Sequence, residues 1–244
     1  MAFRIGGDSR ARNGVESPKG ATDSAGSGRL PVPPSLTQID RIFVQVFAMV
    51  GEAIAGATHA LLAGDREAAK QLMERDETVD LLTREIGSLA QQRLLAEDAD
   101  VGERRELLAV LRMLPDLERN GDLAAHIARR AARGLGAEMS LRSRGLVERM
   151  GEVATTIWRS TADAFADRSV AGAKHVDDLD DELDDLHVTL TAELVAGTMP
   201  LPVAIELAMI ARFYERFGDH AVILARRMAA LVGGGPEPGT SGPD

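Results

Sequence analysis

Apolar side chains recur every three or four residues along most of the chain, which is the spacing of an amphipathic α-helix. The alternation with a period of two that indicates a β-strand does not occur, and few glycines or prolines interrupt the pattern. We therefore predict an all-α fold with six helices. They are expected at about 36–63, 66–96, 103–133, 138–167, 170–196 and 201–232. Pro115 falls inside the third predicted helix and is expected to kink it.

The two ends of the chain lack this pattern. Residues 1–34 are rich in Gly, Ser, Pro and Arg, and residues 233–244 read GGGPEPGTSGPD. Segments of this composition bury too little apolar surface to offset the entropy lost on ordering. We therefore predict a disordered tail at each end.

The helical body between the tails contains an internal repeat. The stretches LERNGDLAAHIARRAA and YERFGDHAVILARRMA begin 97 residues apart and are identical at nine of sixteen positions. A second pair of similar phrases lies upstream, ERDETVDLL at 74–82 and DLDDELDDL at 178–186. Similarity at this level indicates a duplication. We predict one three-helix repeat at 35–135 and a second at 136–232.

Both repeats carry pairs of carboxylates one helical turn apart. Residues i and i+4 lie on the same face of a helix, where like charges destabilise it by roughly 0.2–0.5 kcal/mol. On a helical wheel these residues border the apolar stripe, and Glu118 points into it, so they are expected to face a neighbouring helix. The four pairs are Asp76 with Asp80, Glu118 with Asp122, Asp180 with Asp184, and Glu215 with Asp219.

The acidic run DDLDDELDD at 177–185 favours a bound cation as the reason for this crowding. It has seven carboxylates in nine positions and no positively charged residue. A cation between two such helices would meet only oxygen ligands, which suit hard ions such as Mg²⁺, Mn²⁺, Ca²⁺ or iron. Two other interpretations stay open, namely solvated acids and salt bridges to Arg119 and Arg216.

Composition narrows the classes of function. The 244 residues include no cysteine, which excludes disulfides, thiolate metal sites and cysteine nucleophiles. The formal net charge is −10 and no Lys/Arg-rich block is present, so no direct binding of nucleic acid is expected. A ferritin-like di-metal oxidase is an enzymatic alternative, but it would need Glu-x-x-His motifs, and the nearest phrase is Asp184-x-x-His187.

Residues 43–64 are long and apolar enough to be weighed as a membrane span. Gln45, Glu52 and His59 interrupt the stretch, and Glu52 near its middle would be costly in hydrocarbon. A helix packed inside a bundle explains the same pattern, so we predict no membrane span.

The repeated phrases resemble the signatures of the PhoU family, the phosphate-signalling accessory proteins of bacteria. LERNGDLAAHIA and YERFGDHAVILA match its doubled E-R-x-x-D signature, and DETVDLL and DDELDDL match its D-x-x-V-D-x-L phrase. The resemblance covers about 36–232 and implies two three-helix bundles related by pseudo-twofold symmetry. It also implies that the metal ligands are Asp76, Asp80, Glu118, Asp122, Asp180, Asp184, Glu215 and Asp219.

The resemblance carries further expectations about function. It implies iron, zinc, manganese or magnesium ions on all-oxygen sites, and an adaptor rather than an enzyme. It implies a cytoplasmic homodimer at the inner face of the membrane, which restrains the high-affinity phosphate ABC transporter and holds the phosphate-regulon sensor kinase off when phosphate is plentiful. An accessory protein of a low-affinity phosphate transporter is a close alternative. The chain departs from the family pattern around each site at His126, Ile223, Arg129 and Arg226.

Overall fold

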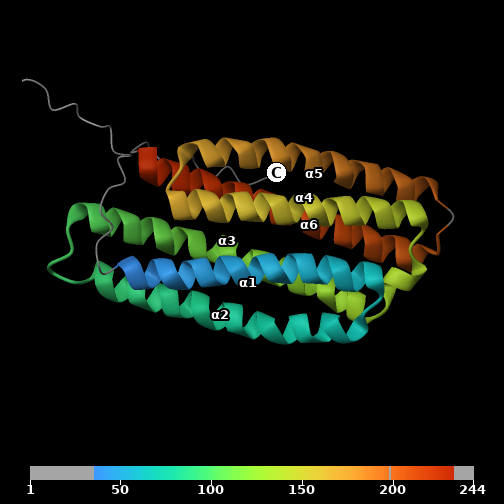
Figure 1. The fold of residues 1–244 in the computed structure, drawn as a ribbon, viewed down its shortest axis with the longest axis horizontal. Coiled ribbons are helices and arrows are strands. Elements are labelled where there is room, and N and C mark those ends of the chain that lie inside the picture. Colours follow the sequence, from blue (N-terminus) through green and yellow to red (C-terminus); the bar gives the residue numbers. More distant parts are fainter. Residues whose placement is uncertain (1–35, 198, 234–244) are drawn as a thin grey trace, which may run out of the picture. The chain divides into compact units, whose positions relative to one another are not determined.

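The computed structural model describes residues 36–197 and 199–233, where all regular structure is helical. Six α-helices follow one another along this part of the sequence (Figure 1). They are α1 (Leu36–Ala63), α2 (Arg66–Leu94), α3 (Val101–Ala132), α4 (Leu141–Asp167), α5 (Val170–Ala196) and α6 (Leu201–Gly233). The predicted all-α class is confirmed. The tails predicted at 1–34 and 233–244 lie outside the described residues, apart from Gly233.

Local side-chain chemistry sets where several helices begin and end. Asp65 accepts hydrogen bonds at 2.9 and 3.1 Å from two backbone N–H groups in the first turn of α2. Asp100 and Ser140 cap α3 and α4 in the same way. The predicted start of the fourth helix at 138 is wrong. Gly134, at φ 89°, follows α3, and the short 3-10 helix η1 (Leu135–Glu138) comes before Ser140.

The helices form two three-helix bundles that lie side by side (Figure 1). In the first bundle α1 packs against α2 and α3, and in the second α4 packs against α5 and α6. The bundles meet where α1 contacts α4 and where α3 contacts α6. Between α1 and α4 the rings of Phe43 and Phe165 stack with centroids 4.7 Å apart, and Trp158 Nε1 donates to the Phe47 carbonyl at 2.7 Å. The expected pair of three-helix bundles is therefore confirmed.

The apolar helix that was weighed as a membrane span lies within the first bundle. By length and composition α1 could cross a membrane, and no other helix in residues 36–197 and 199–233 meets that test. The core helix of a globular bundle has the same character. Phe43, Val46, Val50 and Ile54 are wholly buried. Packing against neighbouring helices thus accounts for the apolar face of α1.

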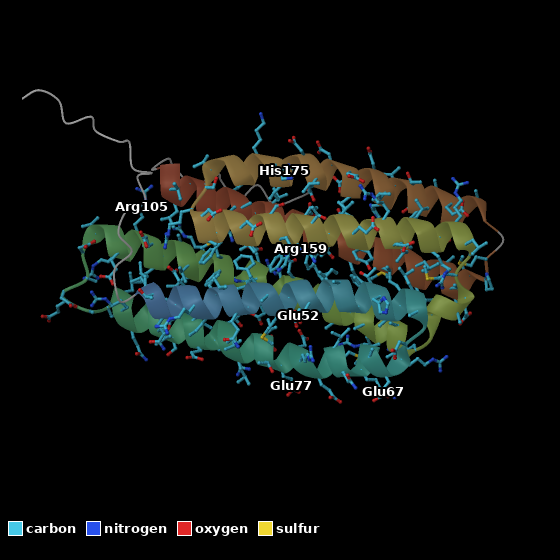
Figure 2. The ribbon with its side chains drawn as sticks, in the orientation of Figure 1. Glu52, Glu67, Glu77, Arg105, Arg159 and His175 are labelled. Carbon is cyan, nitrogen blue, oxygen red and sulfur yellow. The ribbon has the colours of Figure 1, made fainter. Side chains whose placement is uncertain are left out.

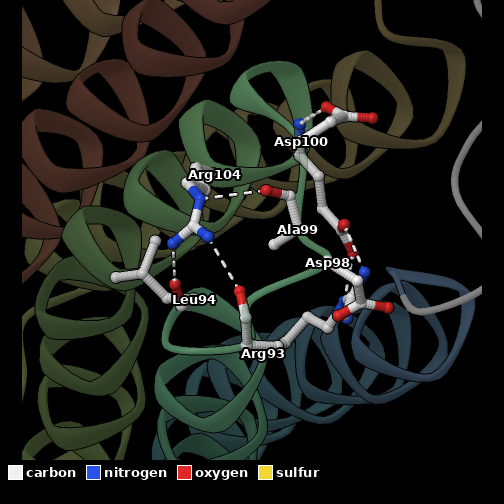
Figure 3. A network of polar contacts seen from close by, with 8 residues as sticks. Arg93, Leu94, Asp98, Ala99, Asp100 and Arg104 are labelled. Carbon is white, nitrogen blue, oxygen red and sulfur yellow. Dashed lines mark hydrogen bonds and ion pairs between the residues drawn. The ribbon is translucent and has the colours of Figure 1, made fainter.

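Arg104 closes the turn between α2 and α3 (Figure 3). Its guanidinium donates hydrogen bonds to the backbone carbonyl oxygens of Leu94, Ala96 and Ala99. The last carbonyls of a helix have no intrahelical partner, so a side chain that reaches them stabilises the helix end. Beside it, Arg93 donates to Asp98 and to the buried Glu103, each at 2.6 Å. The hydrogen bonds and ion pairs of two arginines therefore hold the turn.

A buried ion network joins the two bundles where α3 contacts α6. Asp116 on α3 is 3% exposed, and two side chains of α6 reach it. His220 Nδ1 lies 3.0 Å from its Oδ1, and Arg227 Nη1 contacts its Oδ2. Burial alone would raise the pKa of Asp116, but the hydrogen bond with His220 and the charge of Arg227 hold it below its ordinary value. Asp116 is therefore ionised, and the imidazole Nδ1 donates the hydrogen bond.

Arg130 makes a corresponding contact from α3 to α6. Arg130 and Arg227 are separated by the 97-residue offset of the repeat, and so are Asp116 and Phe213. The guanidinium of Arg130 lies over the Phe213 ring, 4.6 Å from its centroid. Its Nε is also 2.7 Å from Glu206 Oε2, although the groups are not aligned for a hydrogen bond. The two helices run antiparallel, and an arginine from each reaches the other.

Replacing Asp116 with alanine is expected to lower the free energy of unfolding by about 3 kcal/mol, because the buried His220 loses its acceptor and the largely buried Arg227 loses its carboxylate and keeps, among the described residues, only the Arg112 carbonyl. Glu118, two residues along the same helix and exposed, is the matched control. Its replacement by alanine should change the free energy of unfolding by about 0.5 kcal/mol or less. Urea denaturation of chelator-treated protein at pH 7 measures both. Equal costs for the two substitutions would contradict the role given to Asp116.

Candidate metal sites

The structure places the predicted carboxylates on neighbouring helices of the same bundle, because α2 packs along α3 and α5 packs along α6. We call the two groups the first and the second acidic cluster. The first consists of Asp76 and Asp80 on α2 with Glu118 and Asp122 on α3, and the second of Asp180 and Asp184 on α5 with Glu215 and Asp219 on α6.

The charges of the second acidic cluster act strongly on one another. Burial, together with the nearby charges of Asp184, Asp219 and Glu215, raises the pKa of Asp180 to about 7. Burial and the charge of Asp219 also raise the pKa of Asp184 and that of Glu215. All four carboxylates therefore contribute to one region of strongly negative potential.

The first acidic cluster repeats this arrangement with weaker coupling. Burial raises the pKa of Asp76 to about 6, with contributions from the charges of Asp122, Asp80 and, less strongly, Glu118. Arg129 opposes the rise, since a positive charge favours the ionised carboxylate. The two clusters are similar in make-up, and the second carries the larger unfavourable charge interaction.

A glycine on the facing helix lets the central aspartate of each cluster approach the backbone. A Cβ atom on Gly218 of α6 would overlap the carboxylate of Asp180. Gly121 of α3, 97 residues earlier, has the same relation to Asp76, and a Cβ atom there would lie 3.4 Å from Asp76 Oδ1. The glycine that follows E-R-x in both repeats therefore leaves space for a carboxylate, more tightly in the second bundle.

Two oxygens of the second acidic cluster have no partner among the described residues. Asp180 Oδ1 and Glu215 Oε2 are buried and accept no hydrogen bond there. Such oxygens are costly to bury, and a hard cation would satisfy them. The side chains do not form a closed coordination shell, since no group of three or more His, Asp or Glu residues in the described ranges is arranged to hold a metal ion. By donor type and burial, the second acidic cluster offers oxygen ligands of the kind that such a cation binds.

The orientation of the α3 carboxylates differs from the prediction. The helical wheel placed Glu118 in the apolar stripe, but Glu118 and Asp122 are both exposed. α3 packs against α6 as well as α1 and α2, so its buried side includes Asp116 and Asn120. This wider buried side turns Glu118 outward. The prediction was wrong because a wheel drawn for one helix does not show how many neighbours that helix has.

The ion pairs near the clusters are not those of the salt-bridge interpretation, which paired the carboxylates with Arg119 and Arg216. Arg119 lies 3.4 Å from Asp116 on its own helix. Glu215 contacts Arg212, also on its own helix, through one oxygen. The pairing of Glu215 thus compensates part of the charge of the second acidic cluster and leaves its other oxygen unsatisfied.

Two histidines lie near the clusters, His126 near Asp122 and His187 near Asp184. His126 packs its ring against Phe213 of the second bundle with centroids 5.2 Å apart, and burial lowers its pKa. Burial also lowers the pKa of His187, which feels the charge of Asp184. A lowered pKa keeps an imidazole neutral near pH 7. The network of Asp116 and His220 was missed by sequence reasoning, because it depends on the contact between α3 and α6.

The fold and the two clusters define a class of protein: an all-helical chain of two duplicated three-helix bundles, each with an acidic cluster of oxygen donors on two adjacent helices. The family model described as the PhoU domain matches residues 43–131 and 147–228, once in each bundle. The chain belongs to the PhoU domain family. The resemblance drawn from the motifs is therefore confirmed.

Known relatives cover nearly all of the helical body. Phosphate-specific transport system accessory protein PhoU homolog 1 of Mycobacterium tuberculosis is 31% identical over 202 residues, which are 82% of this chain and 91% of that protein. The PhoU homolog of Aquifex aeolicus is 31% identical over 177 residues, 71% of this chain and 80% of the relative. The crystal structure of PhoU from Pseudomonas aeruginosa superposes with a TM-score of 0.77 at 26% identity, over 82% of this chain and 98% of that one.

Asp180→Asn is expected to stabilise the metal-free protein at pH 8 by about 1–2 kcal/mol, after allowance for solvent screening at this partly exposed group. The folded-state pKa of Asp180, about 7, lies above the ordinary value of 3.8. The folded state therefore binds the proton more tightly, and this contribution to stability is lost as pH rises through 7. The gain from Asn should shrink at pH 5.

Urea denaturation of chelator-treated wild type and Asp180→Asn at pH 5 and pH 8 measures this effect. The exposed Asp178, on the same helix, provides the control Asp178→Asn, which removes the same charge outside the second acidic cluster. A gain for Asp180→Asn that is the same at both pH values, or no larger than that of the control, would show that the carboxylates do not crowd one another.

Proposed function

We propose that the chain is an accessory, regulatory protein of a phosphate transport system and acts without catalysing a reaction. The observation that carries the proposal is that both PhoU repeats are present, with the acidic phrases of each in order. The relatives are named as accessory proteins of the phosphate-specific transport system. The match to 98% of the crystallised PhoU from Pseudomonas aeruginosa supports the same role for the whole helical body.

The proposal extends to the partners. The chain restrains the high-affinity phosphate ABC transporter and holds the phosphate-regulon sensor kinase off when phosphate is plentiful. It does so as a homodimer in the cytoplasm, at the inner face of the membrane. Two bundles of similar architecture but different surface chemistry support contact with more than one partner, because each bundle can present its own face.

The proposal includes hard metal ions at the two acidic clusters. In the second, Asp180, Asp184, Glu215 and Asp219 would hold the ion, and in the first, Asp76, Asp80, Glu118 and Asp122 would do so. A bound cation supplies compensation of negative charge and a link between two helices. The buried, unpartnered oxygens of Asp180 and Glu215 support this assignment for the second acidic cluster. The protein's own part is to hold the buried oxygens of Asp180 and Glu215 on adjacent helices.

Converting the second acidic cluster to amides should abolish its metal binding. The variant Asp180→Asn, Asp184→Asn, Glu215→Gln, Asp219→Asn keeps side-chain shape and removes four charges. It should contain less metal than wild type by elemental analysis. Chelator should lower the melting temperature of wild type, because an ion at about a hundredfold over its Kd stabilises the folded state by roughly 2.7 kcal/mol. The variant should melt at or above the chelator-treated wild type.

The matched control removes charge from the exposed side of the same helix. Asp178, Asp181 and Asp185 of α5 are exposed and outside the second acidic cluster. Their triple replacement by asparagine should leave the metal content unchanged. Unchanged metal in the cluster variant, together with a wild-type melting temperature that chelator does not move, would mean that these residues are solvated acids.

Deleting the gene is expected to make phosphate uptake and the phosphate-starvation response constitutive in phosphate-rich medium, because the transporter and the kinase lose their restraint. Radioactive phosphate uptake and a reporter of the starvation response measure the two effects, and a plasmid copy of the gene should restore both. An unchanged response with altered low-affinity uptake would favour an accessory protein of a low-affinity transporter instead. No change in either would remove the proposed function.

A further inference from the structure

The first bundle contains a pocket of about 210 Å³ beside the first acidic cluster. Helices α1, α2 and α3 all contribute to it, and most of its wall is aliphatic. The apolar lining residues are Met49, Ala53, Leu72, Val79, Ala124 and Ala125. Val79 and Ala124 are almost fully buried, whereas the polar lining residues Glu52 and Arg75 are exposed. The pocket thus has a mostly aliphatic lining and charged side chains at its mouth.

The mouth is spanned by an ion pair between α1 and α2. Arg75 Nη1 lies 3.8 Å from Glu52 Oε2, and their side chains are 64% and 71% exposed. Figure 2 shows Glu52 on the side of α1 that lies beside α2. An exposed pair of this kind contributes about 0–1 kcal/mol. It can open for an incoming group at little cost, and Glu52 can then turn its carboxylate to that group.

The carboxylate of Asp76 lines the same pocket. Among the described residues Asp76 makes no hydrogen bond and no ion pair. The nearby charges of Asp122, Asp80 and Glu118 are negative, and the charge of Arg129 compensates them only in part. A partly buried carboxylate without a partner is unfavourable, and a positive charge that enters the pocket would relieve it. The occupant should therefore combine an aliphatic stem with a compact positive group.

We propose that the pocket receives the side chain of a lysine from a partner protein, with its four methylenes along the aliphatic wall and its ammonium at Asp76 and Glu52. An ammonium is a compact charge with three donors on a flexible aliphatic stem, which suits a largely aliphatic pocket whose lining includes two carboxylates. The inference rests on the proposed function as a regulator that docks on other proteins. It names the surface by which such a partner is held.

The second bundle differs at the corresponding positions. The 104-residue offset that aligns Asp76 with Asp180 also aligns Ala53 with Ile157 and Arg75 with Leu179. The family matches begin at 43 and 147, which is the same offset. Ile157 is wholly buried, so its larger side chain occupies space that Ala53 leaves open. A lysine can therefore dock on one bundle only, which gives a duplicated protein a defined orientation on its partner.

The test uses N-acetyl-lysine methyl ester as the probe and full-length, chelator-treated protein. In NMR spectra recorded during the titration, the backbone amide chemical shifts of the pocket residues should change. The changes should give a Kd of about 1 mM, as expected for a fragment of this size. N-acetyl-norleucine methyl ester, which lacks the ammonium, should bind about tenfold more weakly. Equal binding of the two esters would overturn the proposal, and so would shifts that do not centre on the pocket.

Variants locate the site. Asp76→Asn should weaken the lysine probe about tenfold, whereas Asp180→Asn, the same change in the other bundle, should not. Ala53→Ile, which introduces the residue of the second bundle, should close the pocket to both esters. Wild-type affinity in Asp76→Asn or in a folded Ala53→Ile variant would overturn the assignment. If hexylamine binds at least tenfold more tightly than the lysine ester, the pocket prefers a free alkylamine to a lysine side chain of a partner, and the proposal is overturned.

An experiment with Mn²⁺ distinguishes this inference from the proposal of a metal ion at the first acidic cluster. Mn²⁺ bound at the first acidic cluster should weaken the lysine probe, because both need the carboxylate of Asp76. If the probe binds equally well with and without Mn²⁺, the lysine pocket stands and Asp76 is not a metal ligand. If the probe fails to bind the metal-free protein, the lysine pocket is overturned, whatever the metal content of the second acidic cluster.

Discussion

The buried carboxylate of Asp116 is the interaction on which the arrangement of the two bundles depends. It is ionised, nearly inaccessible and held by His220 and Arg227 of the other bundle. A buried charge of this kind adds little net stability compared with apolar packing, but it strongly disfavours any register in which its partners are lost. Helix α3 carries half of the first acidic cluster, and α6 carries half of the second. The register that Asp116 selects between these two helices therefore also determines how the two clusters lie relative to each other.

Within each bundle, the clusters oppose the packing that creates them. The helices approach closely because Gly121 and Gly218 have no side chain, and this approach pushes Asp76 and Asp180 toward other carboxylates. An apolar residue at either aspartate would remove the repulsion and could pack against the glycine. A chain that keeps both the glycine and the aspartate in both repeats retains an unfavourable arrangement twice. A function that needs concentrated negative charge explains this better than folding does.

The helices and the duplication could be predicted from the sequence because both are local patterns. Periodicity located α1, α2 and α5 closely, whereas Gly134 and Ser140 moved the start of α4, since turn chemistry rather than periodicity decides that boundary. Spacing also assigned the eight carboxylates to facing helices. It could not show that Glu118 is exposed or that Asp116 is buried, because both depend on the contact between α3 and α6. Information on that contact is not local in the sequence.

The two repeats share one backbone arrangement, but their side chains differ where they contact the opposite bundle and where they line the pocket. Arg130 and Arg227 both reach across to the opposite bundle, but one meets Phe213 and the other Asp116. At the equivalent place on α1 and α4, Ala53 lines a pocket, whereas the larger Ile157 is wholly buried. Duplication alone would give two interchangeable faces and no preferred orientation. Divergence at such positions makes the two sides of a pseudo-symmetric protein chemically different, so that a partner can bind one side in preference to the other.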